Sequence, residues 1–271
     1  MNPILPAGKG KNLDYYMRDL ETICTEPVVV YNSAMGNGVI GVLGGMGPDA
    51  TAAFFSMLVR LDVAGSDQDH VHIIVESDPS IPDRTRCLLE GGPDPLPAML
   101  ASARRLVAAG ADIVGIPCMT AHAFLPRLRR NCTLPILSAF EEARKALDAF
   151  SPPIRSLGIL GTMGTRRARL FETTMPDKTI LWPSEEDHRS LVMEAIYGTH
   201  GIKAGNLGDE PQRLLVKAAH LLIDRGAQAI VAGCTEVPLV LSQKDFDIPF
   251  IDPMHFLARA LIAAARKGVP E

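Results

Sequence analysis

The sequence predicts an α/β protein made of two similar domains, each with a parallel sheet covered by helices. Short apolar runs alternate with longer stretches of helical periodicity, which is typical of β-α-β units. Three landmarks also recur in the same order at nearly one spacing. GVLGGMG and GILGTMG lie 117 residues apart, Cys118 and Cys234 lie 116 apart, and LPIL and IPFI lie 114 apart. We interpret this as an internal duplication, which relates the domains by a pseudo-twofold axis.

The first copy of the pattern starts with the apolar run VIGVL, residues 39–43, which predicts a buried strand. A proline in the first helical turn is typical of the helix that follows it. The elements expected next are a helix over 48–61, a strand over 71–77, a helix over 96–109 and a strand over 111–116.

The second copy starts with SLGIL, residues 156–160, followed by a glycine-containing turn and a helix. A strand over 178–183, a helix over 210–225 and a strand over 227–233 complete it. We expect an N-terminal extension over 1–36, a first domain over 37–136 plus 246–271, and a second domain over 137–245. SAMGNG, at the end of the extension, is typical of a linker.

Composition excludes several classes of function. A formal net charge of −4 gives no electrostatic reason to bind nucleic acid or an anionic membrane. Charged residues interrupt every apolar run, so no membrane span is expected, and the first residues lack the pattern of a secretion signal. Five cysteines without C-x-x-C spacing argue against a disulfide framework and a zinc ribbon. We therefore expect a cytoplasmic protein, in which Cys24, Cys87 and Cys132 are structural because the duplication does not repeat them.

Cys118 and Cys234 each follow a predicted strand. In parallel sheets, binding sites form beyond the carboxyl ends of the strands, so the two thiols are expected to flank one cleft between the domains. There one thiolate can remove a proton from a carbon atom while the opposite thiol delivers a proton to its other face. A thiol pKa near 8.5 makes both forms accessible near neutrality, and a helix starting after each cysteine would favour the thiolate. The alternative is a pair of buried structural cysteines.

The glycine turns are candidates for binding a substrate carboxylate. Met46 and Gly47 lie in GGMGPDA, while Thr162 and Thr165 lie in the equivalent GTMGT. Backbone N–H groups and threonine hydroxyls can both bind an oxyanion. The first turn also fits the dinucleotide pattern G-x-G-x-x-A, with Asp62 and Asp67 downstream, but its repetition would then imply two cofactors. A tight structural turn remains the third interpretation.

Further polar residues lie close to the cysteines or in loops. Arg84 and Lys203 are candidates for binding a second carboxylate, and surface ion pairs are the alternative. Thr120 and Thr235 follow the cysteines closely. His122 is a candidate for tuning the thiol or for capping a helix, and Glu236 for orienting the thiol or for standing at a helix start, where acids are favoured. A metal site of Cys118, His122 and Cys234 would lack a fourth ligand, so no metal is expected.

Over about residues 39–265 the chain resembles the cofactor-independent aspartate/glutamate racemases, most closely the aspartate racemases. The resemblance rests on GVLGGMGPDAT, PSIPDRT, PCMTAH, GILGTMGT, GIKAGN and GCTE, in this order. It implies two α/β domains, a homodimer, and proton transfer by two cysteines without pyridoxal phosphate or a metal.

Carried over by motif, the resemblance places the catalytic pair on Cys118 and Cys234 and the side-chain carboxylate contact on Arg84. It adds Lys203, and it gives Thr120 and the GTMGT threonines a role in holding the α-carboxylate. One position departs from the family, because Met119 stands where the family usually has asparagine. A thioether is only a weak acceptor, so substrate binding would lose a hydrogen bond of roughly 1.5–3 kcal/mol.

These observations favour racemisation of an acidic amino acid, with aspartate preferred to glutamate. Because of Met119, the same scaffold acting on another amino acid or carboxylate is an alternative. A binding protein with reduced catalysis is another, and a nicotinamide-dependent enzyme ranks last. The expected partners are a small amino acid and a second copy of the chain.

Overall fold

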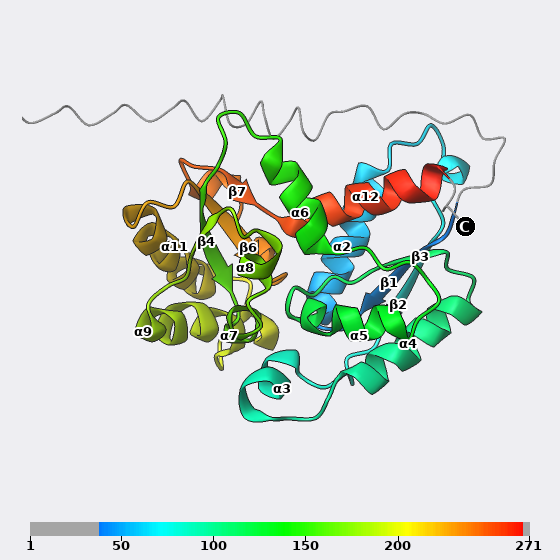
Figure 1. Cartoon of the computed structure of the whole chain (residues 1–271), viewed down its shortest axis with the longest axis horizontal. Coiled ribbons are helices and arrows are strands. Elements are labelled where there is room, and N and C mark those ends of the chain that lie inside the picture. Colours follow the sequence, from blue (N-terminus) through cyan, green and yellow to red (C-terminus); the bar gives the residue numbers. More distant parts are fainter. Residues whose placement is uncertain (1–37, 268–271) are drawn as a thin grey trace, which may run out of the picture.

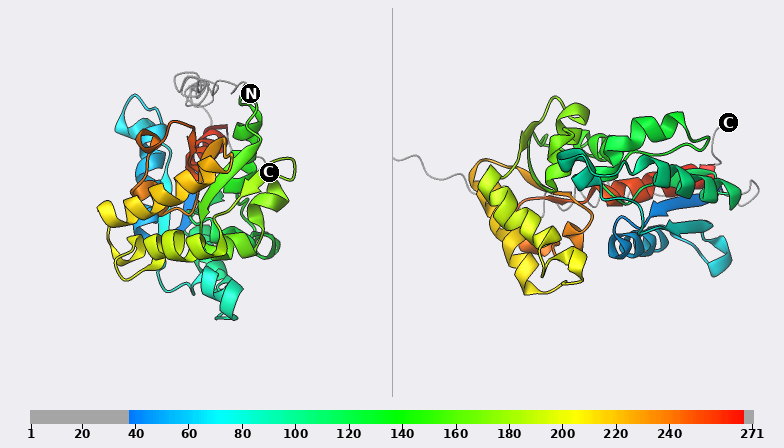
Figure 2. Two further views of the ribbon diagram at one scale, coloured as in Figure 1. Left: turned by 90° about the vertical axis from the view of Figure 1, so that its left-hand side faces the viewer. Right: turned by 90° about the horizontal axis from the view of Figure 1, so that it is seen from below.

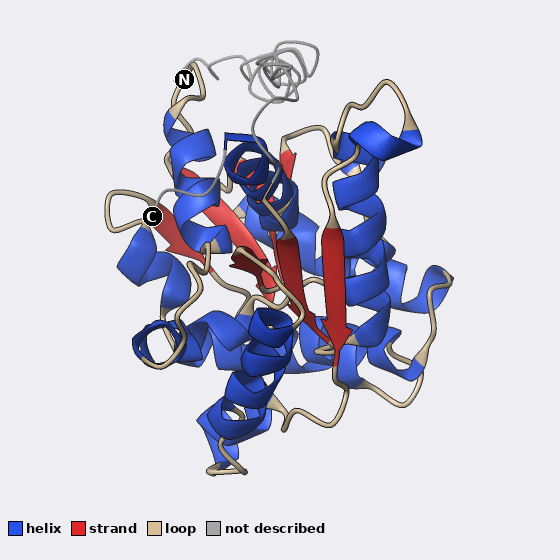
Figure 3. Ribbon diagram, turned by 90° about the vertical axis from the view of Figure 1, so that its right-hand side faces the viewer, coloured by secondary structure: helices blue, strands red, loops and turns tan. Residues whose placement is uncertain are grey.

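The structure, a computed structural model, describes residues 38–267. The expected extension over 1–36 and Cys24 lie outside the described residues. Two parallel sheets lie side by side, with helices packed around them (Figures 1 and 3). Within residues 38–267, no helix combines the length and the apolar composition that crossing a bilayer requires.

The first sheet is built around β1 (Ile40–Gly44), which lies between β2 (Ile73–Ser77) and β3 (Ile113–Gly115). All pairs are parallel. A single bridge from Val114 to Ile136 adds a fourth position beside β3. All five residues of β1 are buried, as its apolar run predicts.

The second sheet repeats this topology. Its strands are β4 (Ser156–Gly161), β5 (Thr179–Leu181), β6 (Ala229–Gly233) and β7 (Phe250–Ile251), in the order β5-β4-β6-β7. The central strand, its two neighbours and the fourth position follow in the same chain order as in the first sheet. The prediction of two similar parallel-sheet units is therefore confirmed.

Helices cover both sheets, and those expected from periodicity end within one residue of their predicted bounds. The first sheet and its helices form the first lobe, and the second sheet and its helices form the second lobe. The helices are α2 (Pro48–Leu61), α3 (Arg84–Glu90), α4 (Leu96–Ala108), α5 (Leu125–Arg130), α6 (Ala139–Asp148), α7 (Met163–Arg167), α8 (Leu170–Thr174), α9 (Glu185–Asp187), α10 (Glu194–Tyr197), α11 (Asp209–Asp224) and α12 (Pro253–Lys267).

Shorter helical turns connect these elements. They are the 3-10 turns η1 (Asp67–Asp69), η2 (Thr120–Phe124), η4 (Ile202–Ala204), η5 (Val237–Leu239) and η6 (Gln243–Asp245), and the π-helical segment η3 (His188–Met193).

Helices α6 and α12 join the lobes. After β7 the chain returns to the first lobe, where α12 packs on α2 and β3 and also on α6. Figures 1 and 2 show α12 beside α6, with α12 extending along the first lobe and the second lobe beyond α6. One hydrophobic core cluster includes Phe54 of α2, Phe140 of α6, Phe171 of α8 and Leu257 of α12. The lobes therefore share a core, which fixes the carboxyl ends of their strands close together.

Candidate active site

Cys118 and Cys234 line one small inner cavity between the lobes. Its volume of about 10 Å³ has room for no more than about one water molecule. Residues from both lobes line it: Met46, Arg84, Cys118, Met119, Thr120, Thr162, Tyr197, Lys203, Cys234 and Glu236. Both cysteines are buried, at 5 % and 4 % exposure. The two strand-end thiols, which the duplication singled out, thus share one space.

The ends of β3 and β6 position the two cysteines. Cys234 directly follows β6, and Cys118 follows the end of β3 by three residues. The segments after them, η2 and η5, are short 3-10 turns rather than the expected α-helices. Their macrodipoles are small because the dipole grows with the number of aligned peptide units. Side chains, rather than helix ends, therefore set the charge around the thiols.

Cys234 lies beside a buried carboxylate. Its Sγ donates a hydrogen bond to Glu236 Oε2 at 2.8 Å, and Lys203 Nζ donates to Glu236 Oε1 at 2.5 Å. Burial, followed by the charge of Glu236, raises the pKa of Cys234 well above its ordinary value. Burial alone would lower the pKa of Lys203, but the charges of Glu236 and Cys234 outweigh it and raise that pKa. Cys234 is therefore a thiol beside an ion pair.

Arg84 occupies the side of the inner cavity nearer the first sheet and is only 6 % exposed. Its NH1 group donates to the carbonyls of Ile81 and Pro82, and NH2 donates to the carbonyl of Met46 at 2.9 Å. Its Nε is buried without a hydrogen-bond partner. Burial works to lower the pKa of Arg84, but the charges of Cys118 and Asp83 raise it overall. Arg84 is therefore a fixed, buried guanidinium that interacts with Cys118 and keeps one nitrogen without a hydrogen-bond partner.

Four buried threonines join the lobes at the inner cavity, which two of them line, and we call them the threonine cluster. Thr120 Oγ1 lies 3.0 Å from Thr162 Oγ1 and 2.9 Å from Thr165 Oγ1, and Thr85 Oγ1 donates to Thr162 Oγ1 at 3.3 Å. Thr162 also caps α7 by accepting from the backbone N–H of Thr165. Gly164 permits this approach, because a Cβ there would lie 2.8 Å from Thr85 Cα.

Tyr197 is a cavity residue that the sequence reasoning did not single out. Its hydroxyl donates to Asp83 Oδ2 at 3.0 Å and lies 3.3 Å from Thr85 Oγ1, across the gap between the lobes. Its ring lies 5.5 Å from Lys203 Nζ. Burial and the charge of Asp83 raise the pKa of Tyr197, so the hydroxyl stays protonated. Its place six residues before Lys203, in the same loop region, was the only available signal.

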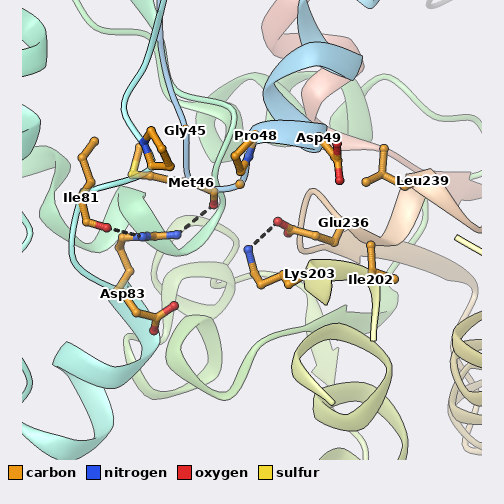
Figure 4. A pocket seen from close by; sticks show the side chains of 13 residues that line it. Gly45, Met46, Pro48, Asp49, Ile81, Asp83, Ile202, Lys203, Glu236 and Leu239 are labelled. Atoms are coloured by element: carbon orange, nitrogen blue, oxygen red, sulfur yellow. Dashed lines mark hydrogen bonds and ion pairs between the residues drawn. The ribbon is translucent and has the colours of Figure 1, made fainter. Parts of the chain in front are cut away.

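A larger outer cavity of about 290 Å³ adjoins the inner one. Met46, Arg84, Lys203 and Glu236 line both cavities, and Gly47 lines the outer one. In Figure 4, Lys203 and Glu236 point toward one another across this space, with Asp49 and Asp83 on opposite sides of it. The volume approaches the lower end of the range for small-molecule sites, roughly 300 Å³.

Three predicted residues lie in neither cavity. Thr165 belongs to the threonine cluster, and the Thr235 hydroxyl donates to Glu236 Oε2 at 3.2 Å. His122 Nδ1 lies 2.9 Å from the carbonyl oxygen of Cys118, and its Nε2 accepts from the backbone N–H of Ala139. His122 thus contacts the backbone of the cysteine loop rather than the thiol.

Two repeated α/β lobes with buried thiols between them define the class to which this chain belongs, that of the amino-acid racemases. The chain is a member of the Asp/Glu/hydantoin racemase family, which matches residues 43–261. The predicted family is therefore confirmed.

Curated and solved relatives agree with this membership. The broad specificity amino-acid racemase RacX of Bacillus subtilis (strain 168) is 25 % identical over 230 residues, which are 83 % of this chain and 97 % of RacX. The aspartate racemase of Picrophilus torridus superimposes with a TM-score of 0.71 at 25 % identity, over 84 % of this chain and 94 % of that one.

A more distant structure shares the fold alone. The glutamate racemase of Francisella tularensis subsp. tularensis SCHU S4, solved in complex with D-glutamate, has a TM-score of 0.61 at 16 % identity. The match covers 88 % of this chain and 86 % of that one.

Proposed function

We propose that this protein racemises an amino acid by two-base proton transfer between Cys118 and Cys234. The observation that carries the proposal is their shared inner cavity, lined from both lobes. Two groups that can each gain or lose a proton, on opposite sides of one carbon atom, are what inversion of that carbon requires.

The reaction proceeds through one proton removal and one proton delivery. The Cα–H bond breaks, its proton forms an S–H bond with the thiolate of one cysteine, and the electron pair remains on Cα. The S–H bond of the other cysteine then breaks and its proton forms a new C–H bond on the opposite face. Charge develops on the α-carboxylate in between, so cations and hydroxyls nearby stabilise the intermediate.

Cations and hydroxyls in the site support a carboxylate-bearing substrate. We assign the α-carboxylate to Thr120 and Thr162 and the side chain of the substrate to the outer cavity, near Arg84 and Lys203. An acidic side chain would compete with Glu236 for Lys203. Similarity to both an aspartate racemase and a broad-specificity racemase supports aspartate as the first substrate to test and other amino acids as the second.

Met119 affects which substrate the site can bind. Its side chain is 1 % exposed and lines the inner cavity, in the place where the resemblance implies asparagine. It offers the substrate ammonium group no strong acceptor. The ammonium group of the substrate therefore needs an acceptor other than Met119.

Cys118→Ala and Cys234→Ala test the proposal directly. General acid–base groups contribute about 10²–10⁴-fold, so each variant should lose racemisation by at least that factor while remaining folded. Cys87→Ala is the matched control, because Cys87 is half-buried and lies outside both cavities. Full activity in either site variant refutes two-base transfer.

The substrate assay uses acidic amino acids, their amides and neutral amino acids in D₂O, without added cofactor. A two-base racemase incorporates deuterium into the product enantiomer, while recovered substrate keeps its hydrogen. Saturable binding without any exchange of the α-hydrogen would instead identify a binding protein.

We further propose a cytoplasmic homodimer, as the resemblance and the reduced cysteines indicate. Light scattering of the purified full chain tests the dimer, since the mass of one chain is 29.2 kDa.

A further inference from the structure

The two cysteines of the inner cavity have opposite electrostatic surroundings. The buried carboxylate of Glu236 accepts a hydrogen bond from the thiol of Cys234. By contrast, the buried guanidinium of Arg84, whose Nε has no hydrogen-bond partner, lines the cavity together with Cys118. We infer that, in the substrate-free protein, the thiolate of the pair resides on Cys118 and the thiol on Cys234. Arg84 and Glu236 are the positioning residues that fix this distribution. The inference rests on the proposed function only for its consequences in catalysis.

Cys234 keeps its proton because of its hydrogen bond to Glu236. An ionised carboxylate only accepts hydrogen bonds, so the 2.8 Å contact between Cys234 Sγ and Glu236 Oε2 requires the thiol proton. Lys203 Nζ forms an ion pair with the other oxygen of Glu236. A thiolate on Cys234 would place two anions in contact inside a site that excludes water.

The guanidinium of Arg84 is the reason to place the thiolate on Cys118. Three bonds to backbone carbonyls hold this guanidinium in place, so its charge cannot swing away from the cavity. Within residues 38–267, no carboxylate is hydrogen-bonded to Cys118. This fixed positive charge, on a residue that lines the same cavity, stabilises a thiolate at Cys118.

Other charged groups face the pair and do not reverse this order. Lys203 interacts with both thiols, and more with Cys234 than with Cys118, but Glu236 offsets its charge directly. The Tyr197 hydroxyl, which is near Cys234, stays neutral because burial raises its pKa. Asp83, which accepts a hydrogen bond from Tyr197, is an acid that interacts with Arg84.

This distribution makes the two directions of catalysis unequal. Turnover that begins with Cys118 as the base ends with a protonated Cys118 and a Cys234 thiolate beside Glu236, the disfavoured arrangement. Enantiomers have equal free energies, so kcat/KM must be equal in both directions. The enantiomer whose Cα–H faces Cys118 should therefore show both a lower KM and a lower kcat than its mirror image.

Thiol alkylation at controlled pH tests the inference without any turnover. The full-length protein is treated with iodoacetamide between pH 5 and 10, and each cysteine-bearing peptide is quantified by mass spectrometry. The midpoint of the pH profile reports thiolate formation separately from access. We expect the Cys118 midpoint to lie at least about one pH unit below that of Cys234.

Two variants with opposite expected signs sharpen the test. Glu236→Gln keeps the side-chain shape but removes the anion, so the Cys234 midpoint should fall by about one pH unit or more. Lys203→Gln removes the compensating cation, so the same midpoint should rise. Cys87 and Cys132 are half-buried thiols in the same protein, and their midpoints should stay unchanged.

A lower midpoint for Cys234 than for Cys118 overturns the inference, and so does a Cys234 midpoint that Glu236→Gln leaves in place. Failure of the racemisation assay with the expected alkylation order would instead overturn the proposed function and leave the charge assignment standing.

Discussion

Replacing Gly164 by alanine tests how closely the lobes have to approach for catalysis. Gly164 lies in α7, where an added Cβ would be 2.7 Å from Thr85 Oγ1, 2.8 Å from Thr85 Cα and 3.0 Å from Thr120 Cγ2. Carbon atoms pack at about 3.5–4.0 Å, so α7 would have to retreat from Thr85 by about 0.7 Å or more. The atom in the way belongs to the backbone of the other lobe and cannot rotate aside.

Overpacking of this kind costs about 1–3 kcal/mol. The clash lies between the lobes, so its cost falls on their approach to one another rather than on the packing within either lobe. At about 1.4 kcal/mol per decade, it corresponds to a loss of roughly 5- to 150-fold in kcat/KM. The free energy of unfolding should change much less than the activity does.

The assay compares kcat/KM for α-hydrogen exchange with the midpoint of urea unfolding for the same preparation. Gly65→Ala is the matched control, because its Cβ would meet only Asp69 Oδ2 at 3.4 Å, an ordinary contact. If kcat/KM for Gly164→Ala lies within twofold of the control, catalysis does not depend on the close approach of α7 to Thr85. A loss of stability as large as the loss of activity would also contradict it, since the strain would then lie within a lobe.

Two further predictions concern residues around Cys118. Met119→Asn restores an amide donor and acceptor in the inner cavity, so KM for aspartate should fall by about tenfold; an unchanged KM would show that the thioether is not what limits binding. Burial lowers the pKa of His122 to about 4, below its ordinary 6.5. The neutral ring therefore stabilises the fold above pH 6.5, and this contribution to the free energy of unfolding is lost as the pH falls from 6.5 toward 4. His122→Gln should reduce the difference in unfolding free energy between pH 7 and pH 5 by about 2 kcal/mol. If urea titrations of the variant show the same difference as the unsubstituted protein, His122 is not its source.

The strands and the paired cysteines could be predicted from the sequence because both are local patterns. A buried parallel strand needs a continuous apolar run, and the runs before Cys118 and Cys234 are such strands. The duplication then supplied the relation between the two thiols. The parallel topology that places both at one edge follows from general rules of α/β folds.

The contacts between the lobes could not be predicted, because they depend on distant segments that no local pattern pairs. Thr85 meets Thr162 from 77 positions away, and Tyr197 meets Asp83 from 114 positions away. The same reason explains Arg84. Its NH2 group donates to the carbonyl of Met46, 38 positions away, and no local pattern indicates this bond.

The small inner cavity also bears on how the protein survives in an oxidising environment. A space that admits about one water molecule excludes glutathione disulfide and other bulky oxidants from both sulfur atoms. Hydrogen peroxide and small thiol reagents such as iodoacetamide are excluded far less than a tripeptide disulfide. Formation of a mixed disulfide with glutathione should therefore be slow at both sulfur atoms in the substrate-free protein.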